Sequence, residues 1–525
     1  MAVELPSEPF PMKKLTHLTR SSLILIVFFG LDKVVAFVRT SIIARQFGRS
    51  TALDAFNVAN NLPDLLFALI SGGAMTMALI PVLSEVMTKA GRSAVWNVFS
   101  RVANLAFVVT GAFAIVIAIF AEPIVSNRLG IAPGYESVQQ TLIANLMRLN
   151  LIATLIFSIS GLVMGGLQAN QHFLLPAMAP LFYNFGQIIG ALVFSPSEPY
   201  TIGPLTLPAM GLGVHGLVYG VILGAAMHLG IQIPGLIRYQ FRWTPSLKLD
   251  EGVVKVLKLI APRLVTMFAI QLIFIVRDNL ASQLPLVGAA TILTYGWFIF
   301  QVPETLIGTA IATVLLPTLS EHAAQGRWEE FRATVDKGVR IMLALSLPVA
   351  AVIAAGLRPL VAAVFGFDDI GTTMLTWTTR IFLIGLAGHT VLEVGVRAFY
   401  AKQDAIRPMV ASILNTAAFI IFGVVVIRQM PQWGTNGIAL VLMAYTVEAI
   451  FVMWWLNRRL EGPPITGASS FVRGFLAALI GGVSAYLLAF YLPGGAIVTA
   501  LIGIIAGGLV ALPIIWKDLR LLFNL

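Results

Sequence analysis

Long apolar segments alternate with short polar connections along the whole chain. Each segment has about 20 residues, enough for a helix to cross a hydrocarbon layer of about 30 Å. The pattern predicts fourteen membrane-spanning helices. They lie at residues 21–44, 54–80, 95–121, 140–164, 172–195 and 213–237, then at 255–284, 288–318, 336–356, 373–400, 406–427 and 435–457, and finally at 468–491 and 495–516.

These segments are predicted to be helices and not strands of a membrane barrel. Barrel strands alternate apolar and polar residues at every second position, and runs such as LIGIIAGGLVALPIIW at 501–516 do not alternate. The first segment is not a cleaved signal peptide, because it is long, contains Asp32, Lys33 and Arg39, and lacks a small-residue cleavage site. The sequence therefore predicts an all-α polytopic membrane protein.

The two parts of the chain repeat one another. Residues 61–85 contain a proline, a small-residue run and IPVLSE, and residues 302–321 repeat this order with LPTLSE. The match continues downstream, and its paired positions are Pro63/Pro303, Pro81/Pro317, Pro123/Pro359, Gly130/Gly366, Thr141/Thr373, Arg148/Arg380, Ala169/Ala401, Gln171/Gln403, Pro176/Pro408, Gly213/Gly434 and Gly216/Gly437. Such a duplication in an apolar chain is typical of a transporter with two lobes around a central site.

The repeat predicts four parts of the chain. We expect a cytoplasmic N-terminal segment at 1–20, a first lobe of six helices at 21–238, a second lobe of six helices at 239–460, and two C-terminal helices at 461–525. Because six is an even number, the two lobes should have the same orientation in the membrane, as parallel repeats.

Composition and charge agree with a membrane location. Of the 525 residues 58% are hydrophobic and 11% are charged, and the mean hydropathy is +0.89, too apolar for a soluble globule. The net charge of +10 is scattered over short connections, which argues against a nucleic-acid surface. Basic residues gather at the N-terminus and in alternate connections, whereas 195–212 and 492–494 have none. The positive-inside rule therefore predicts that both termini are cytoplasmic.

Catalytic and metal-binding motifs are missing from the sequence. The chain has no cysteine, its six histidines show no HExxH spacing, and no Walker loop, GxSxG or dinucleotide fingerprint occurs. We therefore expect no enzyme activity, no cofactor and no metal centre.

The segment from Leu31 to Glu85 reads LDKVVAFVRTSIIARQFGRSTALDAFNVANNLPDLLFALISGGAMTMALIPVLSE. It resembles the first two helices of the MurJ (MviN) family. The resemblance extends through GLQANQHFLLPAMAPLFYN and ATVLLPTLSEHAAQGRWEEF to FYAKQDAIRPMVASILN, over roughly residues 15–460. Members are lipid II flippases of the superfamily that also holds MATE exporters.

The resemblance implies a fourteen-helix protein of the bacterial plasma membrane, whose two lobes enclose a cationic cavity and whose last two helices form a groove for the lipid tail. It also implies transport of undecaprenyl-pyrophosphate-linked disaccharide-pentapeptide to the outer leaflet, with membrane lipids as neighbours. We expect a monomer.

Charges within the apolar segments are the candidate site residues. A charge at mid-bilayer costs at least about 2.5 kcal/mol, so it usually faces water or a partner. Asp32 and Arg39 lie about two helical turns apart, on one face. The predicted cavity residues are Asp32, Lys33, Arg39, Asp54, Asp64, Arg263 and Arg277.

Two interpretations of these charges stay open. A diphosphate head group needs cations, which Lys33, Arg39 and Arg277 supply, and arginine suits it because its planar fork binds phosphate oxygens while staying charged. Alternatively, Arg39 and Arg277 pair with acids such as Asp32, Asp54 and Asp278 and stabilise the lobes. Asp54 is either the N-cap of its own helix or a gate or cavity residue. Asp64 either faces the cavity or pairs across the lobes.

The resemblance places family positions on this chain, with departures. The two cations of the first helix fall on Lys33 and Arg39, and the acid near the start of the second falls on Asp54. Where many relatives carry an arginine and then a glutamate, this chain has Phe67 and Gly72 in the second helix, and Phe298 and Gln301 in the eighth. The sodium site known in some relatives would fall on Asp278 and Asn415, with Phe419 in place of a carboxylate.

Several isolated polar residues on apolar helices are predicted to have structural roles. The repeat mates Arg148 and Arg380 should share one duty, such as bonding a connection or pairing with an acid. His228, His389, Glu393 and Glu448 are each expected to be satisfied packing residues.

The function that we predict is lipid II flipping by alternating access. The alternatives are an exporter of another polyprenyl-linked glycan or of a small molecule, and a membrane scaffold that transports nothing, which the aromatic residues at Phe67 and Phe298 would suit.

Overall fold

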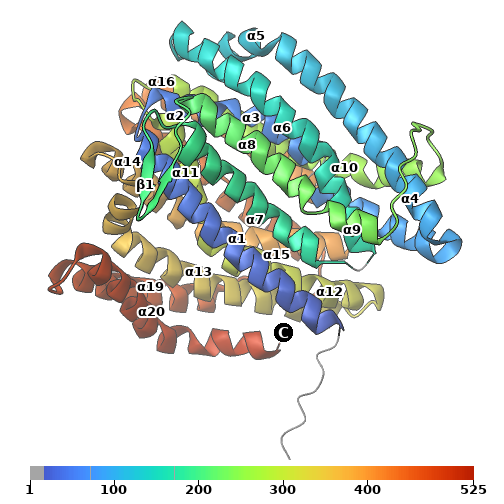
Figure 1. The fold of residues 1–525 in the computed structure, drawn as a ribbon. Coiled ribbons are helices and arrows are strands. Elements are labelled where there is room, and N and C mark those ends of the chain that lie inside the picture. The colour runs from blue at the N-terminus through green and yellow to red at the C-terminus, as the bar shows by residue number, and fades with distance from the viewer. Residues whose placement is uncertain (1–16, 71–72, 171, 525) are drawn as a thin grey trace, which may run out of the picture.

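The computed structural model describes residues 17–70, 73–170 and 172–524. Within them the chain is helical, apart from one short hairpin (Figure 1). The elements up to residue 238 are α1 (His17–Phe47), α2 (Thr51–Ala59), α3 (Asn61–Ile70), α4 (Gly73–Ile119), α5 (Ala121–Ser126), α6 (Ser137–Ala169), α7 (Leu174–Ile189), the π-helical turn η1 (Gly190–Phe194), β1 (Tyr200–Ile202), β2 (Leu205–Leu207), α8 (Val214–Gly230) and α9 (Ile233–Arg238).

The elements after residue 238 are also helical. They are α10 (Glu251–Ser282), α11 (Ala289–Glu304), the π-helical turn η2 (Thr305–Thr309), α12 (Ala310–Ala324), α13 (Trp328–Phe365), α14 (Asp369–Ile384), α15 (Leu386–Ala401), α16 (Ile406–Gln429), η3 (Pro431–Trp433), α17 (Gly434–Leu442), α18 (Tyr445–Asn457), α19 (Ala468–Tyr491), α20 (Ala496–Leu519) and η4 (Arg520–Asn524). The predicted all-α polytopic fold is confirmed.

The described residues contain eleven helices long and apolar enough to cross a membrane, or twelve if the bent pair α14 and α15 forms one span. The predicted first and second spans are not among them. The first corresponds to α1, whose apolar run contains Asp32, Lys33 and Arg39, and the second is divided among α2, α3 and the start of α4. The count of fourteen therefore stays a prediction. The connection 195–212 contains an antiparallel hairpin in which Tyr200 lies opposite Leu207, a feature that the apolar pattern did not predict.

Repeat mates adopt the same local geometry. Arg148 donates from Nε to the carbonyl of Ala118 at 3.0 Å, and Arg380 donates from Nε to that of Ala354 at 2.9 Å. Each arginine thus satisfies a carbonyl of the long helix before it, α4 or α13. The shared structural role predicted for this pair is confirmed.

Two glycines of the repeat have nearly identical backbones. Gly213 has φ 53° and ψ −135°, and Gly434 has φ 52° and ψ −134°. Positive φ is strained for residues with a side chain, which explains why both positions carry glycine.

Most helices pack against partners from the same half of the chain. In the first half of the chain α1 packs on α7, α4 on α6, and α7 on α8. In the second half α10 packs on α16, α11 on α14, and α15 on α18, while α19 and α20 pack on each other and on α13. The halves meet where α10 lies against α3 and α4, where α11 lies against α2, and where α13 lies against α1. The boundaries of the predicted parts stay a proposal, and the predicted segment 1–20 lies mostly outside the described residues.

A column of glycines brings α7 and α8 into backbone contact. A Cβ on Gly186 would lie 2.3 Å from the Cα of Gly224, and one on Gly190 would lie 2.6 Å from the Cα of Gly220. Small residues at this spacing let membrane helices approach closely. Since α7 carries one wall of the site described below, this contact fixes that wall.

We expect Gly186→Ala to destabilise the protein by about 1–3 kcal/mol, because the added methyl group meets backbone that must move apart. The apparent Tm of the purified protein in detergent should fall. Gly508→Ala is the matched control, because a Cβ on Gly508 of α20 meets nothing within 4 Å. An equal Tm for the two variants would contradict the close contact.

Candidate functional site

Two charges of α1 are held by one asparagine of α7. Asn184 donates from Nδ2 to Oδ1 of Asp32 at 2.7 Å, and Arg39 donates to Oδ1 of Asn184 at 2.8 Å. The amide therefore lies between the carboxylate and the guanidinium and orients both. Arg39 also donates to Oγ1 of Thr40 at 3.3 Å. Within the described part of the chain, no carboxylate accepts a hydrogen bond from Arg39.

Lys33 differs from its neighbours on α1. Its side chain is exposed, and it has no hydrogen bond or ion pair with the described part of the chain. A lysine stem within an apolar segment can extend along the protein surface and carry its ammonium group toward water. Lys33 is therefore a free cation on the same helix as Arg39.

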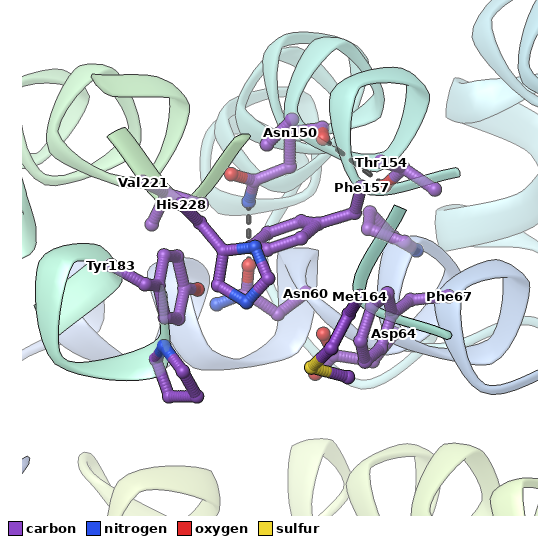
Figure 2. Close-up of a pocket in the computed structure, with 13 residues that line it drawn as sticks. Asn60, Asp64, Phe67, Asn150, Thr154, Phe157, Met164, Tyr183, Val221 and His228 are labelled. Atoms are coloured by element: carbon purple, nitrogen blue, oxygen red, sulfur yellow. Dashed lines mark hydrogen bonds between the residues drawn. The ribbon is translucent and has the colours of Figure 1, made fainter. Parts of the chain in front are cut away.

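The larger cavity lies within the first half, between α3, α6, α7 and α8, and has a volume of about 310 Å³. Figure 2 shows its lining, in which Phe67, Phe157 and Tyr183 form an aromatic wall. The ring of Phe157 lies 5.1 Å from each of the other two. Asp64 is exposed to this cavity and has no hydrogen bond or ion pair within the described residues. We call this the aromatic cavity.

A second cavity of about 190 Å³ lies between the two halves. Arg39 of α1 lines it on one side, and Thr294, Tyr295 and Phe298 of α11 line it on the other. The two cavities share Asn60, Asp64, Tyr183 and Val221 as lining residues. The Nε of Arg39 is buried and has no hydrogen-bond partner in the described residues. This cavity, which we call the central cavity, is therefore bordered by a cation with a free donor and by the unpaired carboxylate of Asp64.

Arg277 does not line either cavity. It is 4% exposed, its Nε donates to Oδ1 of Asp278 at 2.7 Å, and its NH2 group donates to Oγ1 of Thr294 at 3.0 Å. This is the pairing that the sequence left open as the alternative to a cavity role. Arg277 therefore touches the central cavity only through Thr294, which it orients.

Asp54 caps a helix of the other half instead of its own. Ser50 is the N-cap of α2, accepting from the amide of Leu53 at 3.2 Å. The buried carboxylate of Asp54 accepts from the amide of Gly288 at 2.7 Å, and from the amide and hydroxyl of Thr291 at 2.8 and 2.7 Å. The alternative that Asp54 caps its own helix is wrong, because a serine four residues earlier does so. Asp54 instead fastens α2 to the start of α11.

Further contacts join the halves at the same end. Arg49 pairs with Asp368 at 3.1 Å and donates to the carbonyl of Val287 at 2.8 Å, and Ser41 donates to the carbonyl of Val364 at 2.5 Å. The Arg49 guanidinium holds the pKa of the Asp368 carboxyl below its ordinary value, so this acid stays anionic at neutral pH. We call these contacts, with those of Asp54, the clasp.

The two residues of the expected sodium site have different partners. Asp278 pairs with Arg277 and accepts from Nδ2 of Asn61 at 2.8 Å, whereas Asn415 lies within hydrogen-bonding reach of Glu448. A guanidinium this close to Asp278 repels a bound cation. Arg263 lies on α10, but its side chain falls outside the described part of the structure.

The two phenylalanines at positions where the family resemblance implied arginines, Phe67 and Phe298, lie on cavity walls. Phe67 lines the aromatic cavity, while Phe298 lines the central cavity and stacks on Phe37 with ring centroids 6.4 Å apart. Because phenylalanines stand where arginines were implied, these parts of the two cavity walls are apolar.

A cluster in the second half was not predicted. Glu304 of α11 meets His389 and Glu393 of α15, and one ligand atom from each lies within 4.8 Å of the others. His389 Nδ1 is 3.4 Å from Oε1 of Glu304, and Glu393 pairs with Arg397. A histidine and two carboxylates could hold a divalent cation, although Arg397 already neutralises one of them. His389 and Glu393 are not lone polar groups, because α11 brings Glu304 to them, and their expected role as satisfied packing residues stays a prediction. Their spacing of one helical turn was the only signal in the sequence.

His228 fits its predicted role. Its Nδ1 lies 2.6 Å from Oγ of Ser160, a buried hydrogen bond, and its ring packs 5.3 Å from that of Phe157 at the edge of the aromatic cavity.

Comparisons with known proteins agree with one another. The family model described as lipid II flippase MurJ matches residues 43–506. A lipid II flippase MurJ of Burkholderia cenocepacia is 28% identical over 79% of this chain and 78% of its own length. A probable lipid II flippase MurJ of Haemophilus influenzae is 25% identical over 88% of this chain and 90% of its own.

Solved structures show the same fold. A lipid II flippase MurJ in an inward closed conformation matches with a TM-score of 0.76 and 19% identity, over 95% of this chain and all of that one. An inward-facing multidrug resistance MATE family transporter matches with a TM-score of 0.65 and 14% identity, over 83% of this chain and 98% of that one.

Proposed function

This chain belongs to the lipid II flippase MurJ family, and we propose that it carries undecaprenyl-pyrophosphate-linked disaccharide-pentapeptide from the inner to the outer leaflet of the bacterial plasma membrane. The family model covers most of the chain. Flippases are transporters and not enzymes, so the lipid crosses without a change in its covalent bonds.

Arg39 is the observation that carries the proposal for the site. Its guanidinium borders the central cavity between the halves, Asn184 orients it, and its Nε has no partner among the described residues. A guanidinium presents parallel donors that match two phosphate oxygens, and it stays charged in a poorly hydrated site. We therefore assign the diphosphate to Arg39.

Lys33 supplies the second cation in this proposal. It is exposed on α1 and free of partners in the described chain, so it can reach an arriving anion. Arg277 has a supporting role, because Asp278 already neutralises it and Thr294 separates it from the central cavity.

The clasp would close the outer end during part of the cycle. Its residues lie in connections that face outward if both termini are cytoplasmic, as the positive-inside rule predicts. Lobe rocking that opens the outer end would have to break these hydrogen bonds and then remake them. Without an ATP site, the driving force must come from ion gradients, removal of product or the membrane potential, which supplies about 2.3 kcal/mol per charge at 100 mV.

The polyprenyl tail stays in the lipid in this proposal, beside α19 and α20. These helices expose apolar side chains along their outer faces, including Phe471, Phe475 and Leu479 on α19 and Ile505 on α20. We propose that the transporter acts as a monomer.

A leaflet-accessibility assay for lipid II tests the proposal. In a bacterium depleted of its own flippase, this chain should restore outward exposure of lipid II and growth. Restored growth without exposure of lipid II would point to an exporter of another glycan or molecule. Failure of both, with the protein present in the membrane, would favour a scaffold.

A further inference from the structure

The aromatic cavity contains a carboxylate without a counterion. Asp64 projects from α3 into it, and within the described residues no hydrogen bond or ion pair reaches its side chain. The described residues that line the cavity include no lysine and no arginine. An ionised carboxylate on a largely apolar wall attracts a cation, so this arrangement points to a cationic ligand.

The walls around Asp64 suit an ammonium group. Phe67, Phe157 and Tyr183 present rings to the cavity (Figure 2), and ring faces attract cations. Asn150 also lines the cavity, although its Oδ1 is enclosed by protein. This oxygen belongs to a residue that is only 1% exposed, and it has no hydrogen-bond partner in the described chain. The other end of the Asn150 amide is fixed, because its Nδ2 donates to Asn60 at 2.7 Å.

The volume is adequate for an alkylammonium group. The cavity of about 310 Å³ corresponds to roughly ten water molecules at about 30 Å³ each. That space accommodates an amine on a chain of several carbons, but not a disaccharide with its peptide. The ligand is therefore a small cation or one arm of a larger molecule.

We propose that Asp64 and the rings of Phe67, Phe157 and Tyr183 form a binding site for an organic ammonium group. Asp64 also borders the central cavity, where Arg39 lies. One molecule bearing both an anion and an amine could therefore bind Arg39 with the first and Asp64 with the second. The ammonium group comes either from the peptide of the transported lipid, an assignment that rests on the proposed function, or from a separate organic cation.

The first test uses the purified protein in nanodiscs and two small probes. Pentylammonium and 1-pentanol have the same carbon chain, and only the first is charged. Calorimetry should show binding of pentylammonium that is at least about tenfold tighter than that of 1-pentanol, and Asp64→Asn should remove this difference. Phe157→Leu should weaken binding of the ammonium while the protein keeps its apparent Tm. Asp336→Asn, which removes a carboxylate of α13 that lines neither cavity, should change nothing.

Equal affinity for the two probes, or pentylammonium binding that Asp64→Asn does not change, would overturn the proposal. If Asp64→Asn lowers the apparent Tm, Phe157→Leu still tests the site, because it keeps the carboxylate. An unchanged affinity in that folded variant would also count against the aromatic wall.

The second test finds the source of the ammonium group. Lipid II with a free lysine amine in its peptide is compared with the same lipid acetylated at that amine. Weaker binding after acetylation, with no such effect in Asp64→Asn, assigns the site to the substrate. Equal binding of the two lipids supports a separate cation as its ligand. Absence of binding by both lipids contradicts the proposed function instead, and leaves the pentylammonium result standing on its own.

Discussion

Arg39→Ala should abolish lipid II flipping and leave the protein folded and present in the membrane. Among the described residues, the variant removes the one guanidinium that lines the central cavity, together with its free Nε. Two charge-assisted hydrogen bonds to a diphosphate are worth about 3 kcal/mol together, so transport should fall about 100-fold. The measurement is outer-leaflet exposure of lipid II in a flippase-depleted bacterium, with growth as a second readout.

Two further variants make the result specific. Arg39→Lys keeps the charge but not the fork, so it should retain only part of the activity. Arg428→Ala removes an exposed arginine at the end of α16, outside both cavities, and should behave as the wild type. Normal lipid II exposure in Arg39→Ala, at wild-type protein level, would remove Arg39 from the mechanism.

The apolar runs and the internal repeat of the sequence predicted the all-helical fold well. The helices follow from uninterrupted apolar runs, and the duplication was visible because repeat mates keep their residue types. Gly213 and Gly434 illustrate this, since a backbone with positive φ restricts both positions to glycine. The first two spans were harder to predict. Both carry charges of the site, and the second is divided among α2, α3 and the start of α4 although its apolar pattern is continuous.

The site was predicted only in part, because its geometry depends on distant residues. Arg39 could be singled out from its charge, but Asn184, which orients it, lies 145 positions away and is an ordinary polar residue of an apolar helix. Asp54 could not be assigned to α11 for the same reason, since its partner Thr291 is 237 positions downstream. Periodicity gives the face of one helix, but not which helix covers it.

The cluster of Glu304, His389 and Glu393 shows the same limit. The histidine and Glu393 are four residues apart on one helix, a spacing that occurs by chance in many chains. Only the packing of α11 against α15 adds Glu304 and makes the group compact. Arg277 is the opposite case, because its partner Asp278 is adjacent in the sequence, so this ion pair was among the possibilities that the sequence offered.

Asp54→Ala should destabilise the protein and loosen the outer end. The buried carboxylate accepts three hydrogen bonds from Gly288 and Thr291, and its loss leaves two amides and a hydroxyl unpaired. Leaving such groups unsatisfied costs about 3–5 kcal/mol in total, so the apparent Tm in detergent should fall clearly. Asp369→Ala is the matched control at the same end, because the ion pair of Asp369 with Arg358 is exposed and worth at most about 1 kcal/mol.

A cysteine reporter separates loosening of the clasp from general instability. The chain has no cysteine, so Val221→Cys, at a position that lines both cavities, gives a single thiol. If both termini are cytoplasmic, as the positive-inside rule predicts, an impermeant thiol reagent added outside intact cells should label this thiol slowly in the otherwise wild-type protein. Labelling should be faster when Asp54→Ala is added, because the cavity then opens outward more often. A lower Tm with unchanged labelling would mean that Asp54 stabilises α11 without controlling access. Unchanged Tm and unchanged labelling together would show that the contact between α2 and α11 does not hold the halves at this end.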